Sequence, residues 1–287
     1  MAKCFDELVA AKMSQSHELQ LHIQQLEEIR SILNAMKNLA LMAVHKLTQL
    51  QQLQSQVVEH IEDSSTVFLT AYPNFIGKSH RQTVYLVFGS ERGFCGDFNE
   101  ILLNSLENKP DTKIIVIGNR CVSRSESYTH TVIASLNGIN VVEESLSLLE
   151  QLMLQINKLS NENTLIAVYH DLNTNRVEHR QIIPHPLQPP QTKEEVSPPL
   201  LNLSAELFFS KMLEQYLLAV LYEVIYISSL SENRRRLQHL EGAVKHLDEQ
   251  TQKLHRKSQI HRQEEITEEL EVILLNTGFD DQITSNL

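Results

Sequence analysis

Apolar residues recur at steps of three and four along the C-terminal part of the chain, from Ser231 to Leu274. This stretch contains one glycine, Gly242, and no proline. The recurring positions are Leu237, Leu240, Val244, Leu247, Thr251, Leu254, Ser258, Leu270 and Ile273. A stripe this narrow predicts one long helix that packs along a partner helix as a coiled coil.

A matching series occupies the N-terminal part of the chain. It consists of Leu19, Leu26, Ile29, Leu33, Met36, Ala40, Ala43, Leu47, Leu50, Val57 and Ile61. Residues 5–62 include neither Gly nor Pro, so a continuous rod of roughly 85 Å is possible at 1.5 Å per residue. Asp63, Ser64 and Ser65 are turn residues and are expected to end it. The sequence therefore predicts a coiled coil of two antiparallel helices, over 1–62 and 203–275, with a tail over 276–287.

The middle of the chain alternates short apolar runs with amphipathic segments. The apolar runs 83–88, 113–117 and 164–170 predict parallel strands, and 98–106 and 143–159 predict helices between them. Residues 177–183, after the turn 173–175, predict an antiparallel edge strand. The expected fold is thus a doubly wound, Rossmann-like α/β domain over 78–183, inserted between the two halves of the coiled coil. Prolines make 184–202 an extended connector.

Bulk composition excludes several classes of protein. The formal net charge of -11 argues against nonspecific nucleic-acid binding, which requires a basic surface. Cys4, Cys95 and Cys121 are odd in number and lack CxxC spacing, which favours a reducing cytoplasm over a disulfide framework or a zinc site. The N-terminus has no signal-peptide pattern, and no apolar run approaches the roughly 20 residues that span a bilayer, so direct membrane insertion is not expected.

A glycine-containing loop, residues 88–99, follows the first predicted strand at the place where nucleotides bind in α/β folds. The spacing of Gly89, Gly93 and Gly96 matches neither phosphate-binding pattern, so these glycines are expected to serve a tight turn. Cys95 lies near a helix start and is a possible nucleophile, but the favoured reading is a small buried side chain. We expect no catalytic, cofactor-binding or metal-binding residue in the chain.

Four segments, in the same order along the chain, resemble the gamma subunit of F-type ATP synthases. Residues 89–99, GSERGFCGDFN, are similar to the family pattern [SD]-x-R-G-[LF]-C-G-x-[FLY]-N. Residues 228–237 are similar to S-x-x-S-E-x-x-x-R-M, 262–270 to R-Q-x-x-I-T-x-E-[LI], and 32–40 to I-T-x-A-M-x-x-V-A. The resemblance covers nearly the whole chain.

The chain also departs from the family pattern. The family's S-[IV]-x-N-T is replaced by residues 25–29, QLEEI, and its closing Gly-Ala by Asn276-Thr277. Gly242 stands in mid-helix, at a cost of about 1 kcal/mol relative to Ala. These departures favour a divergent bacterial member, of the kind expected for a second-copy gamma in an alternative ion-pumping ATPase.

The resemblance implies a function. By likeness, the chain is the central rotor stalk, a non-catalytic subunit that couples ion flow to ATP synthesis or hydrolysis by rotating. Its implied partners are the alpha and beta subunits of the catalytic hexamer, an epsilon-type subunit and the membrane c-ring, at the cytoplasmic face of the bacterial inner membrane. The interface candidates are Lys37, Lys46, Arg234, Arg235, Arg236, Arg262, Gln263, Thr267 and Glu269, and the structural loop residues are Gly89, Arg92, Gly93, Cys95, Gly96 and Asn99.

Two other classes of protein stay open at this stage. A non-rotary coiled-coil adaptor with an α/β binding module would dimerise alone. A small α/β enzyme with helical oligomerisation arms would need a ligand at the loop from Gly89 to Gly96, and no convincing catalytic constellation accompanies that loop.

Overall fold

The computed structural model describes residues 2–75, 82–106, 112–159, 163–171, 176–184 and 199–284. The chain divides into two compact units, one of Met1–Lys37 with Leu240–Leu287 and one of Asn38–His239. Two long helices, α1 (Ala2–Ala71) and α5 (Ala205–Thr284), each contribute residues to both units. The remaining elements belong to the unit of Asn38–His239.

A five-stranded sheet forms the centre of this unit, in the order β3-β2-β1-β4-β5. The strands are β1 (Gln82–Phe88), β2 (Lys113–Ile117), β3 (Thr131–Leu136), β4 (Asn163–His170) and β5 (Val177–Ile183). The first four are parallel, and β5 pairs antiparallel with β4. The chain therefore winds outward from β1 to β3 and then returns to the other side of β1, which confirms the doubly wound fold class.

Helices cover both faces of the sheet because successive side chains of a strand point to opposite faces. Val84, Leu86 and Phe88 pack in one apolar cluster with α4 (Ser145–Ile156) and α5, whereas Tyr85 and Val87 pack in another with α2 and α3. The latter helices are short, α2 (Phe98–Asn104) and α3 (Asn119–Ser125). Two 3-10 turns, η1 (Pro73–Phe75) and η2 (Val142–Glu144), complete the unit. The core of β1 is thus buried on both sides.

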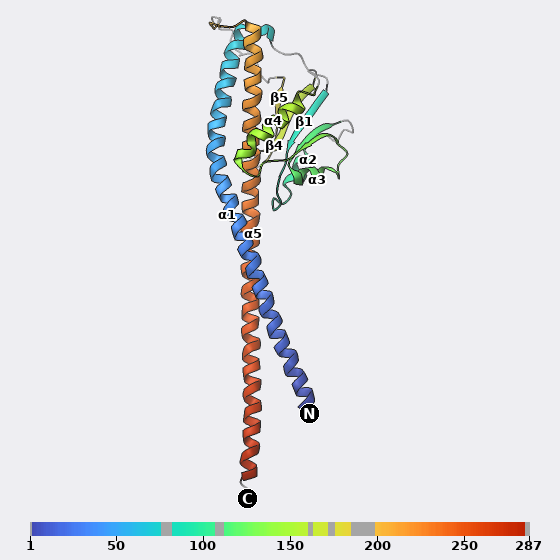
Figure 1. Cartoon of the computed structure of the whole chain (residues 1–287), viewed down its shortest axis with the longest axis vertical. Helices are drawn as coiled ribbons and strands as arrows, with labels where there is room; N and C mark the ends of the chain where they lie inside the picture. The colour runs from blue at the N-terminus through green and yellow to red at the C-terminus, as the bar shows by residue number, and fades with distance from the viewer. Residues whose placement is uncertain are drawn as a thin grey trace. The chain divides into compact units, whose positions relative to one another are not determined.

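Within this unit α1 and α5 lie side by side, and the sheet packs against α5 (Figure 1). The amide of Gln54 donates to the carbonyl of Ala219 at 3.0 Å. Near the end of α1, the ring of Phe68 contacts those of Phe208 and Phe209 at centroid distances of 5.0 and 5.9 Å. Residue numbers rise on α1 as they fall on α5, so the two helices are antiparallel here.

The other unit consists of paired helix segments. Leu33 packs against Leu240 and Val244 in a small apolar cluster. Arg30 forms an exposed ion pair with Asp248. Here too the helices are antiparallel, and the predicted seam residues of α5 at Leu240, Val244 and Thr251 are buried.

The predicted end of the N-terminal helix is wrong. The helix does not end after residue 62 but continues to Ala71. The hydroxyls of Ser64 and Ser65 donate to the carbonyls of His60 and Ile61 at 2.8 and 2.6 Å. This back-bonding within a helix satisfies the hydroxyls that would otherwise form a turn.

The predicted seam register on α1 is also wrong in part. Ile29 and Val57 are each 46% exposed, and Val58 is buried instead. Burial at Leu33 and Leu47 fits a seven-residue repeat, but the next step, from Leu47 to Val58, is eleven residues. A straight helix drifts relative to a strict heptad pattern, so the apolar stripe moves around it.

Other differences concern short elements. The tail predicted at 276–287 is helical as far as Thr284. Helix α3 and strand β3 were absent from the expectation because α3 has only seven residues and four of the six residues of β3 are exposed at the sheet edge. The turn at 173–175 and most of the connector at 184–202 lie outside the described residues.

One described helix, Ala205–Glu271 within α5, is long and apolar enough over one stretch to cross a membrane by length and composition alone. In the fold, 56% of that stretch is buried. Burial of this extent is typical of a helix that packs inside a protein core.

A pair of leucines on α1 tests the contribution of the helix seam. Leu47 is 2% exposed, whereas Leu53 is 60% exposed. We expect Leu47→Ala to lower the free energy of unfolding by about 2–4 kcal/mol, through lost burial and the remaining cavity. Leu53→Ala is the control and should change it by less than about 0.5 kcal/mol. Chemical denaturation of the whole chain, followed by circular dichroism, measures both values, and equal losses would contradict this assignment of the seam.

Candidate functional site

The loop of residues 89–99 connects β1 to α2, includes the first two residues of α2, and contains the predicted structural residues. Gly89 lies so close to α3 that an added Cβ would be 2.2 Å from the Cβ of Cys121. Gly96 has a φ of +62°, and an added Cβ would be 2.3 Å from the ring of His239 on α5. Gly89 therefore requires glycine for its close approach to α3, and Gly96 favours glycine for its left-handed backbone.

A buried carboxylate of α5 fixes this loop. Glu232 is 5% exposed, and its two carboxylate oxygens accept hydrogen bonds from the backbone N–H groups of Glu91 and Arg92, at 3.2 and 3.1 Å. Burial raises the pKa of the Glu232 carboxyl, although Arg236 and the two N–H groups act in the opposite direction. The carboxylate thus binds the turn through its main chain.

Arg236, one helical turn further along α5, completes the arrangement. Its guanidinium pairs with Glu232, donates to the carbonyl of Gly93 at 3.1 Å and donates to the side chain of Asn233 at 2.8 Å. A buried ion pair is tolerated when further hydrogen bonds satisfy both partners, as they do here. We call Glu232, Arg236 and the loop of residues 89–99 the loop clamp.

Further hydrogen bonds hold the loop from within. Asn99 accepts from the backbone N–H of Ser90 and donates to its hydroxyl, both at 2.8 Å. Ser228 on α5 donates to the carbonyl of Phe88 at 3.0 Å. The loop motif and the α5 motif, which are far apart in the sequence, therefore form one contact in the fold.

The loop clamp occupies the position at which α/β folds bind phosphate. The backbone N–H groups of Glu91 and Arg92, directly after β1, bind the Glu232 carboxylate in place of an external anion. The next two loops are bound in the same way, since the carboxylate of Glu91 accepts from the N–H groups of Asn119 and Gly138 at 2.9 and 2.7 Å. These donors are satisfied by the chain itself, which argues against a nucleotide at this edge of the sheet.

The buried cysteines lack the properties of nucleophiles. Burial raises the pKa of the Cys95 thiol to about 12, and burial also raises that of Cys121 to about 12. The sulfur of Cys95 lies 3.5 Å from the carbonyl oxygen of Gly93, inside the loop clamp. Within the described residues, no group of three or more His, Cys, Asp or Glu side chains could hold a metal ion.

The basic interface candidates divide into internal and external residues. Arg236 is 6% exposed and belongs to the loop clamp, so it is not available to a partner protein. Arg235 pairs with Asp97 at 2.9 Å, and Lys46 pairs with Glu143 of η2. Arg234 is exposed, and Lys37 is partly exposed.

The candidates of the C-terminal motif all lie on the surface of α5. The exposed residues are Arg262, Gln263, Thr267 and Glu269. The hydroxyl of Thr267 donates to the carbonyl of Gln263 at 2.8 Å. Their exposure in the isolated chain leaves their polar groups accessible to a partner.

A groove runs beside the loop clamp and carries positive charge. It is lined by Arg92, Arg120 and Arg124, by Glu100, and by Phe94, which is 52% exposed and has a φ of +64°. Glu100 pairs with Arg124. Sequence analysis missed Arg120 and Arg124, because only the folded loops bring α3 beside the loop of residues 89–99.

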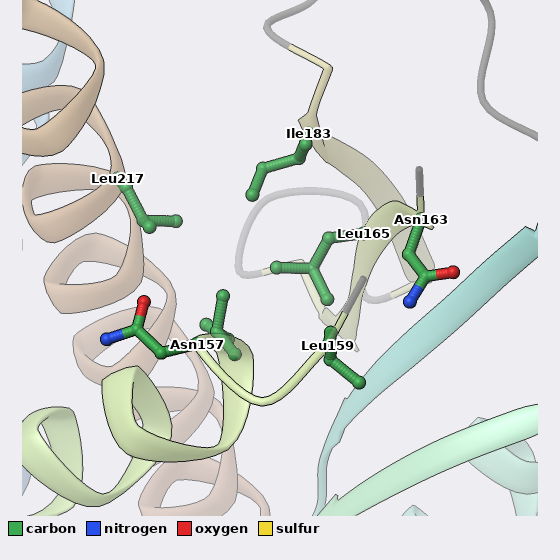
Figure 2. Close-up of a pocket in the computed structure, with 7 residues that line it drawn as sticks. Asn157, Leu159, Asn163, Leu165, Ile183 and Leu217 are labelled. Carbon is green, nitrogen blue, oxygen red and sulfur yellow. The ribbon is translucent and has the colours of Figure 1, made fainter. Parts of the chain in front are cut away.

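A second hollow lies between α4, the strands β4 and β5, and α5. Figure 2 shows Leu165, Ile183 and Leu217 around it, with Asn157 and Asn163 also among the lining residues. None of its lining residues can act as an acid or a base near neutral pH, so this hollow offers no catalytic group.

Comparison with known proteins connects this geometry to a family. A family model described as ATP synthase matches residues 15–275, most of the chain. The chain belongs to the ATP synthase family. The resemblance to gamma chains carried by the four motifs is confirmed by curated relatives. The ATP synthase gamma chain of Clostridium beijerinckii is 24% identical over 281 residues, covering 90% of this chain and 95% of the relative. That of Mycoplasmopsis synoviae is 21% identical, covering 91% and 98%.

Solved structures share the fold. A chain of the Euglena gracilis mitochondrial ATP synthase, from a structure of OSCP, F1 and c-ring, matches with a TM-score of 0.66 at 15% identity, covering 92% of this chain and 94% of its own. A chain from the rotor of the same enzyme matches with a TM-score of 0.63 at 14% identity, covering 88% and 99%. The family fold therefore includes both the sheet and the long helices.

The loop clamp predicts that mutation of Arg236 destabilises the fold much more than mutation of its neighbour Arg235. Arg236→Met leaves the Glu232 carboxylate buried without its partner, so we expect the free energy of unfolding to fall by about 3–5 kcal/mol. Arg235→Met breaks an ion pair that is largely exposed and should cost less than about 1 kcal/mol. Chemical denaturation of both variants measures these values. Recovery of stability when Glu232→Gln is added to Arg236→Met would support the clamp, and similar losses in the two single variants would refute it.

The raised thiol pKa values predict slow alkylation. In a Cys4→Ser variant, neither Cys95 nor Cys121 should react appreciably with iodoacetamide at pH 7–8, because the thiolate is the reactive form and the pKa of each lies near 12. Both should react once the chain is unfolded in urea. Mass spectrometry of labelled peptides measures the extent, and rapid labelling of folded Cys95 would mean that its thiol is accessible and ionised.

Proposed function

We infer that the chain is the central-stalk rotor subunit of an F-type ATP synthase or ATPase, and that it performs no catalysis itself. It couples ion translocation through the membrane ring to ATP synthesis or hydrolysis in the catalytic hexamer. The observation that carries this function is the loop clamp on α5. It fixes the sheet to a helix that continues without interruption to Thr284, so a force applied to the sheet reaches the helix directly.

The partners proposed for this subunit are the alpha and beta subunits of the hexamer, an epsilon-type subunit and the c-ring. Family membership and the rotor and c-ring assemblies of the structural relatives support partners of this kind in general. We place the chain at the cytoplasmic face of the bacterial inner membrane, bound peripherally, since its curated relatives are bacterial.

Exposed polar residues supply the proposed contacts with the hexamer. Arg234 and the arginines of the groove, Arg92, Arg120 and Arg124, present positive charge on a chain of net charge -11. Charge of this sign would attract acidic segments of a partner and set the docking orientation. We propose the same role for Lys37 and, after exchange of their present partners, for Lys46 and Arg235. Arg236 has a structural role instead.

The C-terminal motif offers the sharpest test of this function. Alanine replacement of Arg262, Gln263, Thr267 and Glu269 should lower the number of ions pumped per ATP by at least about fivefold, the lower end of a typical coupling between sites. The matched control replaces four other exposed residues of α5, Gln252, Lys253, Arg256 and Gln259, and should leave the ratio unchanged.

Each variant would be expressed with an affinity tag in the native cell and purified in mild detergent. Co-purifying proteins would be identified by mass spectrometry, and ATP hydrolysis and ATP-driven ion uptake would be measured in vesicles. Recovery of a catalytic hexamer and a membrane ring with the unaltered chain supports the rotor function. Recovery of the chain alone or as a homodimer would refute it and would favour a coiled-coil adaptor.

A further inference from the structure

A second buried ionic arrangement lies at the opposite side of the sheet from β3, on the edge strand β5. The guanidinium of Arg180 donates to Glu223 of α5 at 2.5 Å and to Glu62 of α1 at 3.0 Å. Ser55 of α1 donates to the other carboxylate oxygen of Glu223, also at 2.5 Å. One arginine thus joins the sheet to both long helices. We call these four residues the Arg180 bridge.

The Arg180 bridge is largely removed from water. The side chain of Arg180 is 22% exposed, and that of Glu223 is 8% exposed. Burial acts to lower the pKa of Arg180, but the nearby Glu223 carboxylate outweighs it and raises that pKa. Tyr169 and Tyr216 lie close enough to interact electrostatically with Arg180, and burial raises the pKa of each to about 12. The opposite charges of Arg180 and Glu223 are therefore paired in a site that is partly shielded from water.

Stability alone does not account for such an arrangement. Apolar residues of similar volume often replace a buried ion pair with no loss of stability, or with a gain. What apolar contacts do not supply is direction, because hydrophobic attraction is nearly independent of orientation. The planar guanidinium presents parallel and divergent N–H groups, so one arginine binds two carboxylates in a fixed geometry that the single ammonium of a lysine does not reproduce.

We propose that Arg180 is a positioning residue that fixes α1 and α5 relative to each other and to the sheet, so that torque passes between the sheet and both helices without slippage. This proposal rests on the rotor function proposed above. The loop clamp joins α5 to the loop after β1, whereas the Arg180 bridge joins both α5 and α1 to strand β5. Without the bridge, apolar packing and the hydrogen bond from Gln54 to the carbonyl of Ala219 would still join α1 to α5, and these contacts resist turning and sliding less than a buried ion pair does.

Four variants separate positioning from stability. Arg180→Gln removes the positive charge. Arg180→Lys keeps the charge but loses the planar guanidinium that binds two carboxylates. Glu62→Gln weakens only the contact with α1. In the double variant Arg180→Met with Glu223→Leu, apolar packing replaces the ion pair. The matched control is Lys211→Gln, which breaks an exposed ion pair with Glu214 within one helix.

The measurement is the ratio of ions pumped to ATP hydrolysed, in purified, fully assembled complexes reconstituted in vesicles. We expect Arg180→Gln and the double variant to lower the ratio by about fivefold or more while ATP hydrolysis continues. Arg180→Lys and Glu62→Gln should give smaller losses, and Lys211→Gln none. A role in folding alone would change the yield of assembled complex but not the ratio within assembled complexes.

An unchanged ratio in assembled Arg180→Gln or double-variant complexes overturns the proposal. If neither assembles, the partial variants decide, because Glu62 is 38% exposed and its loss leaves the buried pair with Glu223 intact. A normal ratio in both Glu62→Gln and Arg180→Lys would then also overturn it. Failure of the rotor function itself is distinguishable, since the unaltered chain would then co-purify with no ATPase subunits and support no pumping.

Discussion

The burial of one carboxylate, that of Glu232, constrains the part of the structure on which function depends. Removing such a charge from water costs several kcal/mol, so the carboxylate requires partners of fixed geometry. Two backbone N–H groups and Arg236 supply them. The backbone must then turn sharply after β1, and this turn places Phe94 and Gly96 in left-handed conformations. The residue pattern of the loop is therefore a consequence of what α5 buries beneath it.

The sequence could not predict contacts between residues that lie far apart along the chain. Most helices and most strands follow from periodic patterns, because those patterns reflect local geometry that each segment carries by itself. The loop motif and the Glu232 motif could be recognised separately, but their contact spans about 140 residues of sequence. The partners of Arg180 are 43 and 118 residues away, and nothing in the segment around Arg180 distinguishes it from a solvent-exposed strand residue.

The run of three arginines on α5 shows how much depends on helix rotation. Consecutive residues of a helix point about 100° apart, so three neighbouring arginines lie in three different environments. Arg234 faces solvent, Arg235 reaches Asp97 at the rim, and Arg236 enters the loop clamp. The sequence predicts a basic cluster at this point, whereas the fold assigns only part of it to a partner surface. The same step of about 100° explains why Val58 is buried and Val57 is not.

Directional and non-directional contacts are distributed unequally between the two units. In the unit with the sheet, the buried ion pair of Glu232 and Arg236 holds the loop after β1 to α5, and Arg180 joins β5 to Glu223 of α5 and to Glu62 of α1. Hydrogen bonds to charged groups such as these have a defined geometry. In the unit of paired helix segments, the described contacts include an apolar cluster around Leu240 and exposed contacts of Arg30 with Asp248 and of Glu27 with His255, which are weak in water. Apolar seams permit small rotations at little cost, since dispersion and burial depend weakly on angle. For the rotor function proposed above, the first kind of contact resists slippage between the sheet and the helices, and the second lets the paired helix segments adjust to a partner surface.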